Sequence, residues 1–501
     1  MDVRRMLIGG ELVEAASGRT FEVVDPCRVE TVGRVPQGGA EDVDRAVAAA
    51  RRAFDEGPWP AMAPEERVRL LLDVADRLEA RQDELMALES RQAGIPIRKT
   101  TLMDIPVGLE MFRSMVRASL RVARYEPLPW IDFPAVSWNF VLREPVGVCA
   151  GICAWNFPWL FAMWKSAPAL AMGNTLVLKP ASYTPLTALE FARACVEAGL
   201  PPGVVNVVTG GGGTVGAALC EHPGVDKVSF TGSTEVGREV QRRAAATVKR
   251  VTLELGGKSP NIVLPDADLA LAVDGALFAA FFNAGQACEA GTRLLLHEAI
   301  HEEFLERLRE RIGRVRVGDT ADFETTMGPL ITEGQRRKVE EYIRSAREEG
   351  ATLLCGGGRP KDVPPGWFVE PTVFAGVTPG MRIFREEIFG PVLAVTRFGT
   401  LDEAVALAND TTYGLAAAVW SRDTLGALDL ARRIRAGTVW INDYHLIHAD
   451  APFGGYKQSG RGRELGRYGL EEYTEIKHVH VDQIGPDRDR KFWFDYVMNR
   501  E

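Results

Sequence analysis

The sequence predicts an α/β protein built from two α/β domains and a small β extension. From about residue 146, short β-branched runs alternate with segments of helical character, and a second series of the same kind begins at about residue 267. Such alternation is typical of parallel sheets joined by crossover helices. The strand ends of such sheets commonly bind nucleotides, so functional side chains are expected there.

The first series contains four runs that are typical of strands. They are NTLVLK (174–179), GVVNVV (203–208), KVSF (227–230) and RVTLEL (250–255). After the first run, Thr184 and Pro185 fit the N-cap and first position of a helix. The preceding apolar stretch 147–164 is nearly long enough to span a bilayer, but Asn156 and Pro158 interrupt it. A buried strand followed by a turn and a helix therefore fits it better.

A helix, a second series and two separate stranded segments complete the expected fold. Residues 64–92 carry an apolar stripe at helical spacing among many charges, which predicts an amphipathic surface helix. The second series contains a helix at about 267–284 and a strand at 293–299. Segments 130–145 and 475–482 alternate polar and apolar residues outside both series, as expected for a sheet extension that makes subunit contacts.

The composition excludes several classes of partner. The chain has 501 residues, with 59 Lys and Arg against 68 Asp and Glu, and no basic run could track a phosphate backbone. We therefore expect no nucleic-acid partner and no membrane partner. The N-terminus lacks the apolar core of a signal peptide, and an odd number of scattered cysteines argues for reduced thiols, so a cytoplasmic location is expected. No Cys or His group has metal-ligand spacing, and no metal is expected.

The stretch FFNAGQACEAGTR (281–293) places Cys288 among small residues. These neighbours are Gly285, Ala287, Ala290 and Gly291. They leave the sulfur open to close approach, as a nucleophilic thiol requires. The same small residues also suit a tight turn, so the stretch alone leaves both readings open.

Two polar side chains stand where strands are expected to end. In LELGGKSP, Glu254 lies between leucines, where burial would raise its pKa towards that of a base, although a structural role is an equal alternative. In WNFPW, Asn156 lies at a strand-to-helix turn, where its amide could donate a hydrogen bond to an oxyanion. A helix N-cap is the more common use of such an asparagine.

Three further signals lie at neighbouring strand ends. FTGSTEVG ends a strand and opens a helix, so Gly232, Ser233 and the free N–H groups of the helix could face a pyrophosphate. Lys179, at the end of another strand, could meet ribose hydroxyls or phosphate. The run TGGGGTVG (209–216) fits the dinucleotide fingerprint only weakly, and a flexible turn is an equal alternative.

Taken together and in this order, these motifs resemble those of the aldehyde dehydrogenase superfamily. The resemblance extends to EEIFGPV (386–392) and PFGGYKQSGRGRELG (452–466) and covers about residues 5–483. The separation of Glu254 and Cys288 along the chain also matches the family. The resemblance implies an aldehyde dehydrogenase-like fold: a Rossmann-like cofactor domain, an α/β catalytic domain and a small β oligomerisation extension.

The resemblance also implies an NAD(P)-dependent oxidation of an aldehyde to the carboxylic acid. Cys288 would attack the aldehyde carbon to give a thiohemiacetal, while Asn156 and the Cys288 backbone N–H would hold the oxyanion. After hydride transfer, Glu254 would activate the water that hydrolyses the thioacyl-cysteine. Lys165 occupies a family position near the oxyanion site.

Two alternatives to this reaction stay open. Relatives that pass the acyl group to coenzyme A typically lack the glutamate, so Glu254 favours hydrolysis without excluding transfer. A catalytically silent structural protein on this fold would be expected to lose the nucleophile or the base, and this sequence keeps both.

The same motif matching implies binding residues. Those expected at NAD or NADP are Trp155, Lys179, Ser182, Gly232, Ser233, Leu255, Glu387 and Phe389. Those expected along the substrate tunnel are Phe157, Trp164 and Phe453, for which core packing is an equal alternative.

Three departures from the family pattern carry expectations of their own. Ser182 stands where many NAD-specific relatives carry a glutamate that repels a 2′-phosphate, so use of NADP alongside NAD is expected. Ala287 and Glu289 flank Cys288, so no vicinal disulfide can form in this loop. The loop 442–452 contains no arginine that could bind a carboxylate, which favours an uncharged or aromatic aldehyde.

These features together predict the division of the chain. The expected parts are an NAD(P)-binding domain over 1–124 and 146–256, a catalytic domain over 257–470, oligomerisation strands over 125–145 and 471–485, and a C-terminal extension over 486–501. A homodimer or homotetramer is expected. The aromatic tail 484–501 is expected to dock on a neighbouring subunit or across a substrate entrance.

Overall fold

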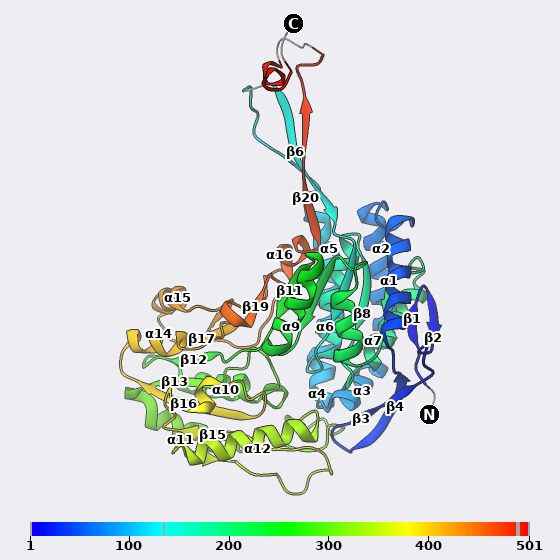
Figure 1. The fold of residues 1–501 in the computed structure, drawn as a ribbon. Coiled ribbons are helices and arrows are strands. Elements are labelled where there is room, and N and C mark those ends of the chain that lie inside the picture. The colour runs from blue at the N-terminus through cyan, green and yellow to red at the C-terminus, as the bar shows by residue number, and fades with distance from the viewer. Residues whose placement is uncertain (1–2, 134–135, 487–490, 499–501) are drawn as a thin grey trace.

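Two large sheets form the body of the protein, and a small third sheet projects from it as a narrow arm (Figure 1). The computed structural model describes residues 3–133, 136–486 and 491–498. Helices cover both large sheets, and the α/β class predicted from the sequence is confirmed.

The first sheet has eight strands within the described residues, in the order β19-β11-β10-β7-β8-β9-β1-β2. The strands are β1 (Met6–Ile8), β2 (Glu11–Val13), β7 (Val148–Ile152), β8 (Thr175–Lys179), β9 (Val205–Val207), β10 (Lys227–Thr231), β11 (Arg250–Glu254) and β19 (Gly460–Arg461). The central strands from β11 to β9 are parallel, and the short strands at both edges pair antiparallel. The parallel strands therefore end at one edge of the sheet, where the site lies.

Both faces of this sheet are covered, as the side chains of β8 illustrate. Leu176 and Leu178 pack into the core that contains α6, whereas Val177 packs into the core that contains α1. Successive side chains of a strand point to opposite faces, so an unbroken apolar run means burial on both sides. The helices of this part are α1 (Ala40–Asp55), α2 (Pro64–Glu79), α3 (Gln82–Ala93), α4 (Ile97–Lys99), α5 (Ile105–Ala118), α6 (Pro158–Ala171), α7 (Leu186–Glu197), α8 (Ala217–Glu221) and α9 (Thr234–Ala244).

The second sheet has seven strands within the described residues, in the order β14-β15-β16-β13-β12-β17-β18. The strands are β12 (Pro260–Val263), β13 (Arg293–His297), β14 (Thr352–Cys355), β15 (Thr372–Ala375), β16 (Val392–Phe398), β17 (Ala416–Trp420) and β18 (Thr438–Ile441). The helices of this part and of the C-terminal segment are α10 (Leu269–Phe281), α11 (His301–Ile312), α12 (Glu333–Glu348), α13 (Arg382–Arg385), α14 (Leu401–Asn409), α15 (Thr424–Arg433) and α16 (Gly466–Glu471). All its strands except β14 run parallel.

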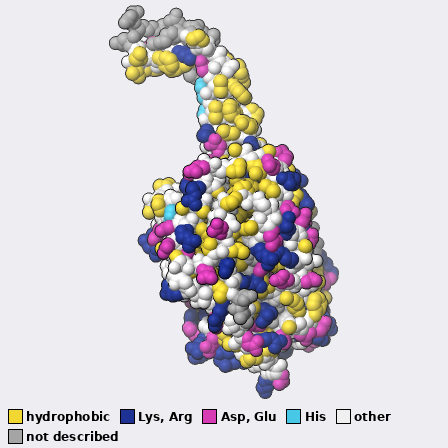
Figure 2. Space-filling view, turned by 90° about the vertical axis from the view of Figure 1, so that its right-hand side faces the viewer, with side chains coloured by type: hydrophobic (Ala, Val, Ile, Leu, Met, Phe, Trp, Pro, Cys, Tyr) yellow, Lys and Arg dark blue, Asp and Glu magenta, His cyan; other side chains and the backbone are white. Residues whose placement is uncertain are grey.

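The arm is an antiparallel sheet of β5 (Tyr125–Pro127), β6 (Ser137–Pro145) and β20 (Thr474–Asp482). It joins segments that lie far apart in the sequence, and its apolar side chains stay exposed (Figure 2). The described part of the tail, 491–498, lies at the tip of the arm, away from the body of its own chain (Figure 1). Residues 487–490 and 499–501 of the predicted tail lie outside the described residues.

A fourth, two-stranded sheet of β3 (Thr20–Asp25) and β4 (Glu30–Pro36) lies near the N-terminus. The apolar stretch 147–164 forms β7 and the start of α6, as predicted. No described helix is both long enough and apolar enough to cross a membrane.

The helix predicted over 64–92 is wrong in one respect, because the structure divides it into α2 and α3. Arg81 leaves the helical conformation, with φ −118° and ψ 20°, and its guanidinium binds Glu197 at 2.9 Å. A contact with α7, rather than a local breaker residue, accompanies the interruption. The apolar stripe keeps its helical spacing across Arg81, so the sequence pattern did not reveal the break between α2 and α3.

The N-cap predicted at Thr184 is also wrong. Helix α7 begins at Leu186, whose backbone N–H donates to Gln92 Oε1 at 2.7 Å. The hydroxyl of Thr184 is buried without a hydrogen-bond partner among the described residues. The donor at the helix start is thus satisfied by a side chain from α3, which no local pattern in the sequence could indicate.

One buried asparagine ties the first sheet, α6 and the root of the arm together. Asn174 accepts from Gly147 N at 2.9 Å and donates to the carbonyls of Ala169 at 3.1 Å and Tyr473 at 3.0 Å. Asn174→Leu would leave the Gly147 N–H buried without its acceptor and would remove one donor from each of the two carbonyls, so we expect a loss of about 2 kcal/mol or more in stability. Thermal unfolding of the purified variant should start well below that of the wild type. Leu425→Ala, at an exposed position, is the control and should unfold as the wild type does.

Candidate active site

Two cavities meet at Cys288. An apolar cavity of about 730 Å³ is lined on one side of the sulfur, chiefly by Phe157, Phe161, Trp164, Phe282 and Phe453. A polar cavity of about 640 Å³ lies on the other side, at the strand ends of the first sheet. Cys288 lines both cavities, so a group bound in one can meet a group bound in the other at the sulfur.

An unusual backbone turn presents Cys288. After α10, Asn283, Ala284 and Gly285 have φ values of 54°, 56° and 70°, three left-handed residues in a row. A Cβ at Gly285 would lie 2.2 Å from the carbonyl oxygen of Gly390, so this position requires glycine. The small residues around Cys288 therefore serve the turn as well as the open approach to the sulfur, and both readings of the sequence apply.

The thiol of Cys288 is held by the residue that follows it. Its sulfur donates to Glu289 Oε2 at 3.1 Å. Burial, and then the negative charge of Glu289, raise the pKa of the Cys288 thiol well above its ordinary value. The resting thiol is therefore protonated, and it needs nearby positive charge or a proton acceptor before it can attack.

Asn156 lies in the wall of the polar cavity next to Cys288. Its Nδ2 donates to the carbonyl of Gln286 at 3.0 Å, which fixes the amide close to the nucleophile loop and leaves the second N–H for another acceptor. Helix α6 starts after Phe157 without a side-chain cap, so Asn156 is not the helix cap that was the common alternative.

Glu254 is the last residue of β11 and lies in the same wall. Both carboxylate oxygens are buried without a hydrogen-bond partner among the described residues. Burial, and then the negative charge of Glu464, raise the pKa of Glu254 well above its ordinary value, against the opposing charge of Lys165. A carboxylate of this kind is a stronger base than an exposed one.

Lys165 lies in neither cavity wall. Its Nζ binds Glu464 Oε1 at 2.6 Å and Ser229 Oγ at 3.1 Å, fully buried beneath the sheet edge. Its position near the oxyanion site, implied by the resemblance, stays a prediction. Lys165 acts on the site through charge, by lowering the pKa of Glu254.

Most residues expected at the cofactor line the polar cavity. They are Trp155, Gly232, Ser233, Leu255, Glu387 and Phe389. Ser233 caps α9 by accepting from Val236 N, so the helix starts at the cavity with free N–H groups. Glu387 accepts from Gly257 N at 3.0 Å, and burial raises the pKa of Glu387 to about 7. The rings of Trp155 and Phe389 meet edge to face at 5.3 Å.

Lys179 and Ser182 lie at the same sheet edge but outside the wall of the polar cavity. Lys179 donates to the carbonyl of Pro180, and burial lowers the pKa of Lys179 to about 8. Ser182 Oγ donates to the carbonyl of Gly210 at 2.9 Å, which brings the glycine run beside it.

Sequence reasoning missed five residues of the polar cavity wall: Ala154, Thr231, Gly256, Gln335 and Lys338. Thr231 and Gly256 belong to motifs already singled out, and the hydroxyl of Thr231 is buried without a partner among the described residues. Gln335 and Lys338 come from α12, and nothing in its surface pattern of charges marks them.

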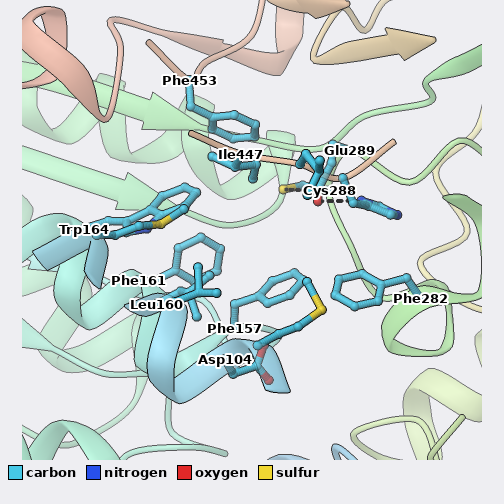
Figure 3. A pocket seen from close by; sticks show the side chains of 15 residues that line it. Asp104, Phe157, Leu160, Phe161, Trp164, Phe282, Cys288, Glu289, Ile447 and Phe453 are labelled. Atoms are coloured by element: carbon cyan, nitrogen blue, oxygen red, sulfur yellow. Dashed lines mark hydrogen bonds and ion pairs between the residues drawn. The ribbon is translucent and has the colours of Figure 1, made fainter. Parts of the chain in front are cut away.

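Phe157, Trp164 and Phe453 all line the apolar cavity, with the rings of Trp164 and Phe453 in edge contact at 5.5 Å (Figure 3). Met103, Val107, Leu160 and Ile447 complete much of the wall. A bound molecule would meet mainly rings and methyl groups there.

The acidic groups of the apolar cavity are paired with bases. Lys99 Nζ binds both oxygens of Asp104 at 2.7 Å, and His445 Nδ1 lies 3.0 Å from Glu289 Oε1. Burial alone would raise the pKa of Glu289, but the hydrogen bond and charge of His445 more than offset it and hold that pKa below its ordinary value. The wall therefore offers little net charge to a substrate.

Comparison with known proteins settles the family. A sequence model described as the aldehyde dehydrogenase family matches residues 12–479. The chain belongs to the aldehyde dehydrogenase family. This confirms the resemblance seen in the motifs and the expected enzyme class.

Individual aldehyde dehydrogenases match over nearly the whole chain. Betaine aldehyde dehydrogenase of Bacillus subtilis (strain 168) is 47% identical over 479 residues, which cover 95% of this chain and 96% of the relative. Mitochondrial benzaldehyde dehydrogenase of Antirrhinum majus is 46% identical over 478 residues, covering 95% and 88%. The NAD+ complex structure of aldehyde dehydrogenase from Bacillus cereus superposes with a TM-score of 0.93 at 44% identity, covering 96% of this chain and 97% of that one. The aldehyde dehydrogenase fold expected from the motifs is confirmed.

The buried charges predict the pH dependence of an aldehyde dehydrogenase reaction in which Glu254 is the base. Glu254 accepts a proton only when ionised, so activity should rise with pH as this carboxyl loses its proton. Glu464→Gln removes the negative charge that raises the pKa of Glu254 and leaves Lys165 unpaired nearby. Both effects lower the pKa of Glu254, so the rise in kcat should move to lower pH.

The measurement is kcat against pH at saturating aldehyde and cofactor. Glu475→Gln is the control, because Glu475 pairs with Arg250 on the outside of the protein. The control profile should match that of the wild type. A Glu464→Gln profile that stays in place, or moves to higher pH, would contradict the assignment of Glu254 as the titrating base.

Proposed function

We propose that this chain oxidises an uncharged aldehyde to its carboxylic acid with NAD+ or NADP+, through a covalent intermediate on Cys288. The observation that carries the proposal is the position of Cys288 at the junction of the apolar and polar cavities, with Asn156 and Glu254 in the same wall. The substrate would enter from the apolar side and the cofactor from the polar side.

In the first step, the thiol proton of Cys288 passes to solvent water as the sulfur bonds to the aldehyde carbon, and the carbonyl oxygen takes up the negative charge. The free N–H of Asn156 and the backbone N–H of Cys288 would hold that oxygen. When bound, NAD+ supplies the hydride acceptor that turns this adduct into a thioester.

In the last step, Glu254 takes a proton from water while the water oxygen bonds to the acyl carbon. The carbon–sulfur bond then breaks, and the sulfur leaves with the bonding electrons. The buried, unpartnered carboxylate of Glu254 supports hydrolysis over transfer to coenzyme A, because water needs a base and a thiol acceptor has less need of one.

The polar cavity fits a dinucleotide. The free N–H groups at the start of α9 suit a pyrophosphate, and Glu387 and Lys179 suit ribose hydroxyls. A Cβ at Gly232 would lie 2.4 Å from the ring of Phe230, so this position in the cavity wall requires glycine. The unpartnered hydroxyl of Thr231 provides a further donor or acceptor.

We propose the following assembly and location. The cofactor domain comprises 1–124 and 146–256 and the catalytic domain 257–470, as supported by the division of their strands between the two large sheets. The exposed apolar side chains of the arm support its use in a homodimer or homotetramer. All seven cysteines are free, which supports a reducing compartment such as the cytoplasm.

The reaction is tested by the formation of reduced cofactor on a panel of aromatic, aliphatic and amino aldehydes. We expect turnover of uncharged aldehydes and a loss of at least a thousandfold in Cys288→Ala, which lacks the nucleophile. Cys355→Ala, at another partly exposed cysteine, should keep wild-type activity. The proposal is falsified if Cys288→Ala retains the wild-type rate.

Glu254→Gln separates hydrolysis from the earlier chemistry. The variant should release about one reduced cofactor per active site and then nearly stop, because the acyl group stays on Cys288. Rapid mixing with absorbance at the reduced nicotinamide band measures the burst. A steady rate without a burst in Glu254→Gln would favour the transfer alternative. So would a wild-type enzyme that turns over fully only when coenzyme A is added.

The choice between NAD and NADP is tested at Ser182. A hydroxyl does not repel a 2′-phosphate, so the wild type should accept both cofactors. Ser182→Glu places a carboxylate near the ribose and should lower kcat/KM for NADP at least tenfold while NAD is retained. Ser182→Gln, similar in size but uncharged, is the matched control and should lose much less activity with NADP.

A further inference from the structure

Glu289 is the polar group closest to the nucleophile on the substrate side. It lines the apolar cavity, and its Oε2 accepts the hydrogen bond from the Cys288 thiol at 3.1 Å (Figure 3). Its other oxygen lies 3.0 Å from His445 Nδ1. Neither residue has a task in the reaction proposed above, although both are buried and would be costly to keep without one.

We propose that Glu289, held in place by His445, selects aldehydes that carry a neutral hydroxyl group on the first or second carbon beyond the aldehyde carbon. This inference rests on the proposed function, because it names the substrate class of the same site. It makes Glu289 a specificity-determining residue.

The position of Glu289 is built into the fold rather than left to a flexible side chain. Its backbone carbonyl accepts from the Tyr444 hydroxyl at 2.8 Å, and His445 packs against the rings of Phe278 and Phe282 at 5.1 and 4.9 Å. His445 has a φ of 62°, an uncommon conformation for histidine that the surrounding contacts maintain. The carboxylate is therefore fixed relative to the sulfur.

His445 also determines how much charge Glu289 presents. The second ring nitrogen, Nε2, lies 3.2 Å from the carbonyl oxygen of Ala279, which can only accept. With an acceptor at each nitrogen, a ring that carries two protons would donate to both and would balance an ionised Glu289. The pair is then neutral overall but keeps an acceptor oxygen at the cavity.

The acceptor loses its partner during the reaction. When Cys288 gives up its proton, the sulfur has no hydrogen left to donate to Glu289. The loss of a donor to a buried carboxylate destabilises the state in which Cys288 has given up its proton. A hydroxyl group on the bound substrate would replace the thiol as the donor and remove this cost at the step where the sulfur attacks.

The chemistry of the wall decides between a hydroxyl and an ammonium donor. Asp104 is already neutralised by Lys99, and Glu289 by His445. An ammonium group would bring an unbalanced charge into a cavity of rings and methyl groups, whereas a hydroxyl brings none. The choice of carbon follows from geometry, because the sulfur that bonds to the aldehyde carbon lies only 3.1 Å from the accepting oxygen.

The test compares two aldehydes of similar shape, one with a hydroxyl and one with a methyl group. The pairs are 2-hydroxypropanal with 2-methylpropanal and 2-hydroxybenzaldehyde with 2-methylbenzaldehyde. For each enzyme, the ratio of kcat/KM between the members of a pair is measured. We expect the ratio in the wild type to exceed that in Glu289→Met about tenfold or more, because methionine is similar in length but offers no comparable acceptor.

Glu289→Gln is the matched control, since its amide oxygen still accepts a hydrogen bond, and its ratios should lie between those of the other two. The ratio within one enzyme does not depend on how much of the enzyme is folded, so loss of stability cannot produce the effect. Equal ratios in the wild type and Glu289→Met overturn the inference. If the wild type oxidises both members of each pair without preferring the hydroxyl compound, the inference is overturned and the proposed function stands. If the wild type oxidises no aldehyde, both are overturned.

A binding measurement covers the case in which the variants turn over too slowly. In Cys288→Ala the thiol is gone, so Glu289 is free to accept from a ligand. Calorimetry should then show tighter binding of 2-hydroxybenzaldehyde than of 2-methylbenzaldehyde. The difference should vanish in Cys288→Ala/Glu289→Met, and its persistence there would contradict the role of Glu289.

Discussion

The close approach of backbone and side chains at Gly256 and Gly257 is the constraint on which the site depends. These residues link β11 of the first sheet to β12, the first strand of the second. A Cβ at Gly256 would lie 2.3 Å from Glu387 Oε2, and one at Gly257 would lie 2.3 Å from the carbonyl oxygen of Cys288. Only glycine allows the nucleophile loop and Glu387 to close on this link from the second α/β unit. Glu254 stands two residues before it, so the base and the nucleophile meet because the two sheets are joined there.

Charge buried without full compensation characterises this site. Lys165 and Glu464 neutralise each other, yet the second oxygen of Glu464 and both oxygens of Glu254 have no hydrogen-bond partner among the described residues. Such groups reduce stability, and proteins commonly retain them where a shifted pKa is useful. The pairs around the substrate cavity follow the opposite rule, with each acid matched by a base. The base thus remains reactive while the substrate wall stays nearly neutral.

The sequence predicts much of this arrangement, and the exceptions have identifiable causes. Cys288, Asn156 and Glu254 were found because each belongs to a local motif at a strand end or turn. The parallel sheets followed from the alternation of strand and helix patterns. Thr184 was wrongly assigned a cap because Gln92, which accepts from the backbone N–H at the start of α7, comes from a distant part of the chain. The pairing of Lys165 with Glu464 is equally distant in sequence, so no local pattern indicated it. Gln335 and Lys338 were missed for a related reason, since an exposed helix surface has the same composition whether or not it borders a cavity.

The last tenth of the chain supplies side chains and a strand that complete the site. Phe453 closes the substrate side, Ser459 donates to the carbonyl of Gly256 at 2.7 Å, and Glu464 pairs with Lys165. Strand β19 adds to the edge of the first sheet beside Glu254. On the ribosome, where earlier segments fold first, the other strands of both sheets are synthesised before this segment. A growing chain therefore holds its cysteine in an unfinished site, and catalytic competence arrives only near the end of translation.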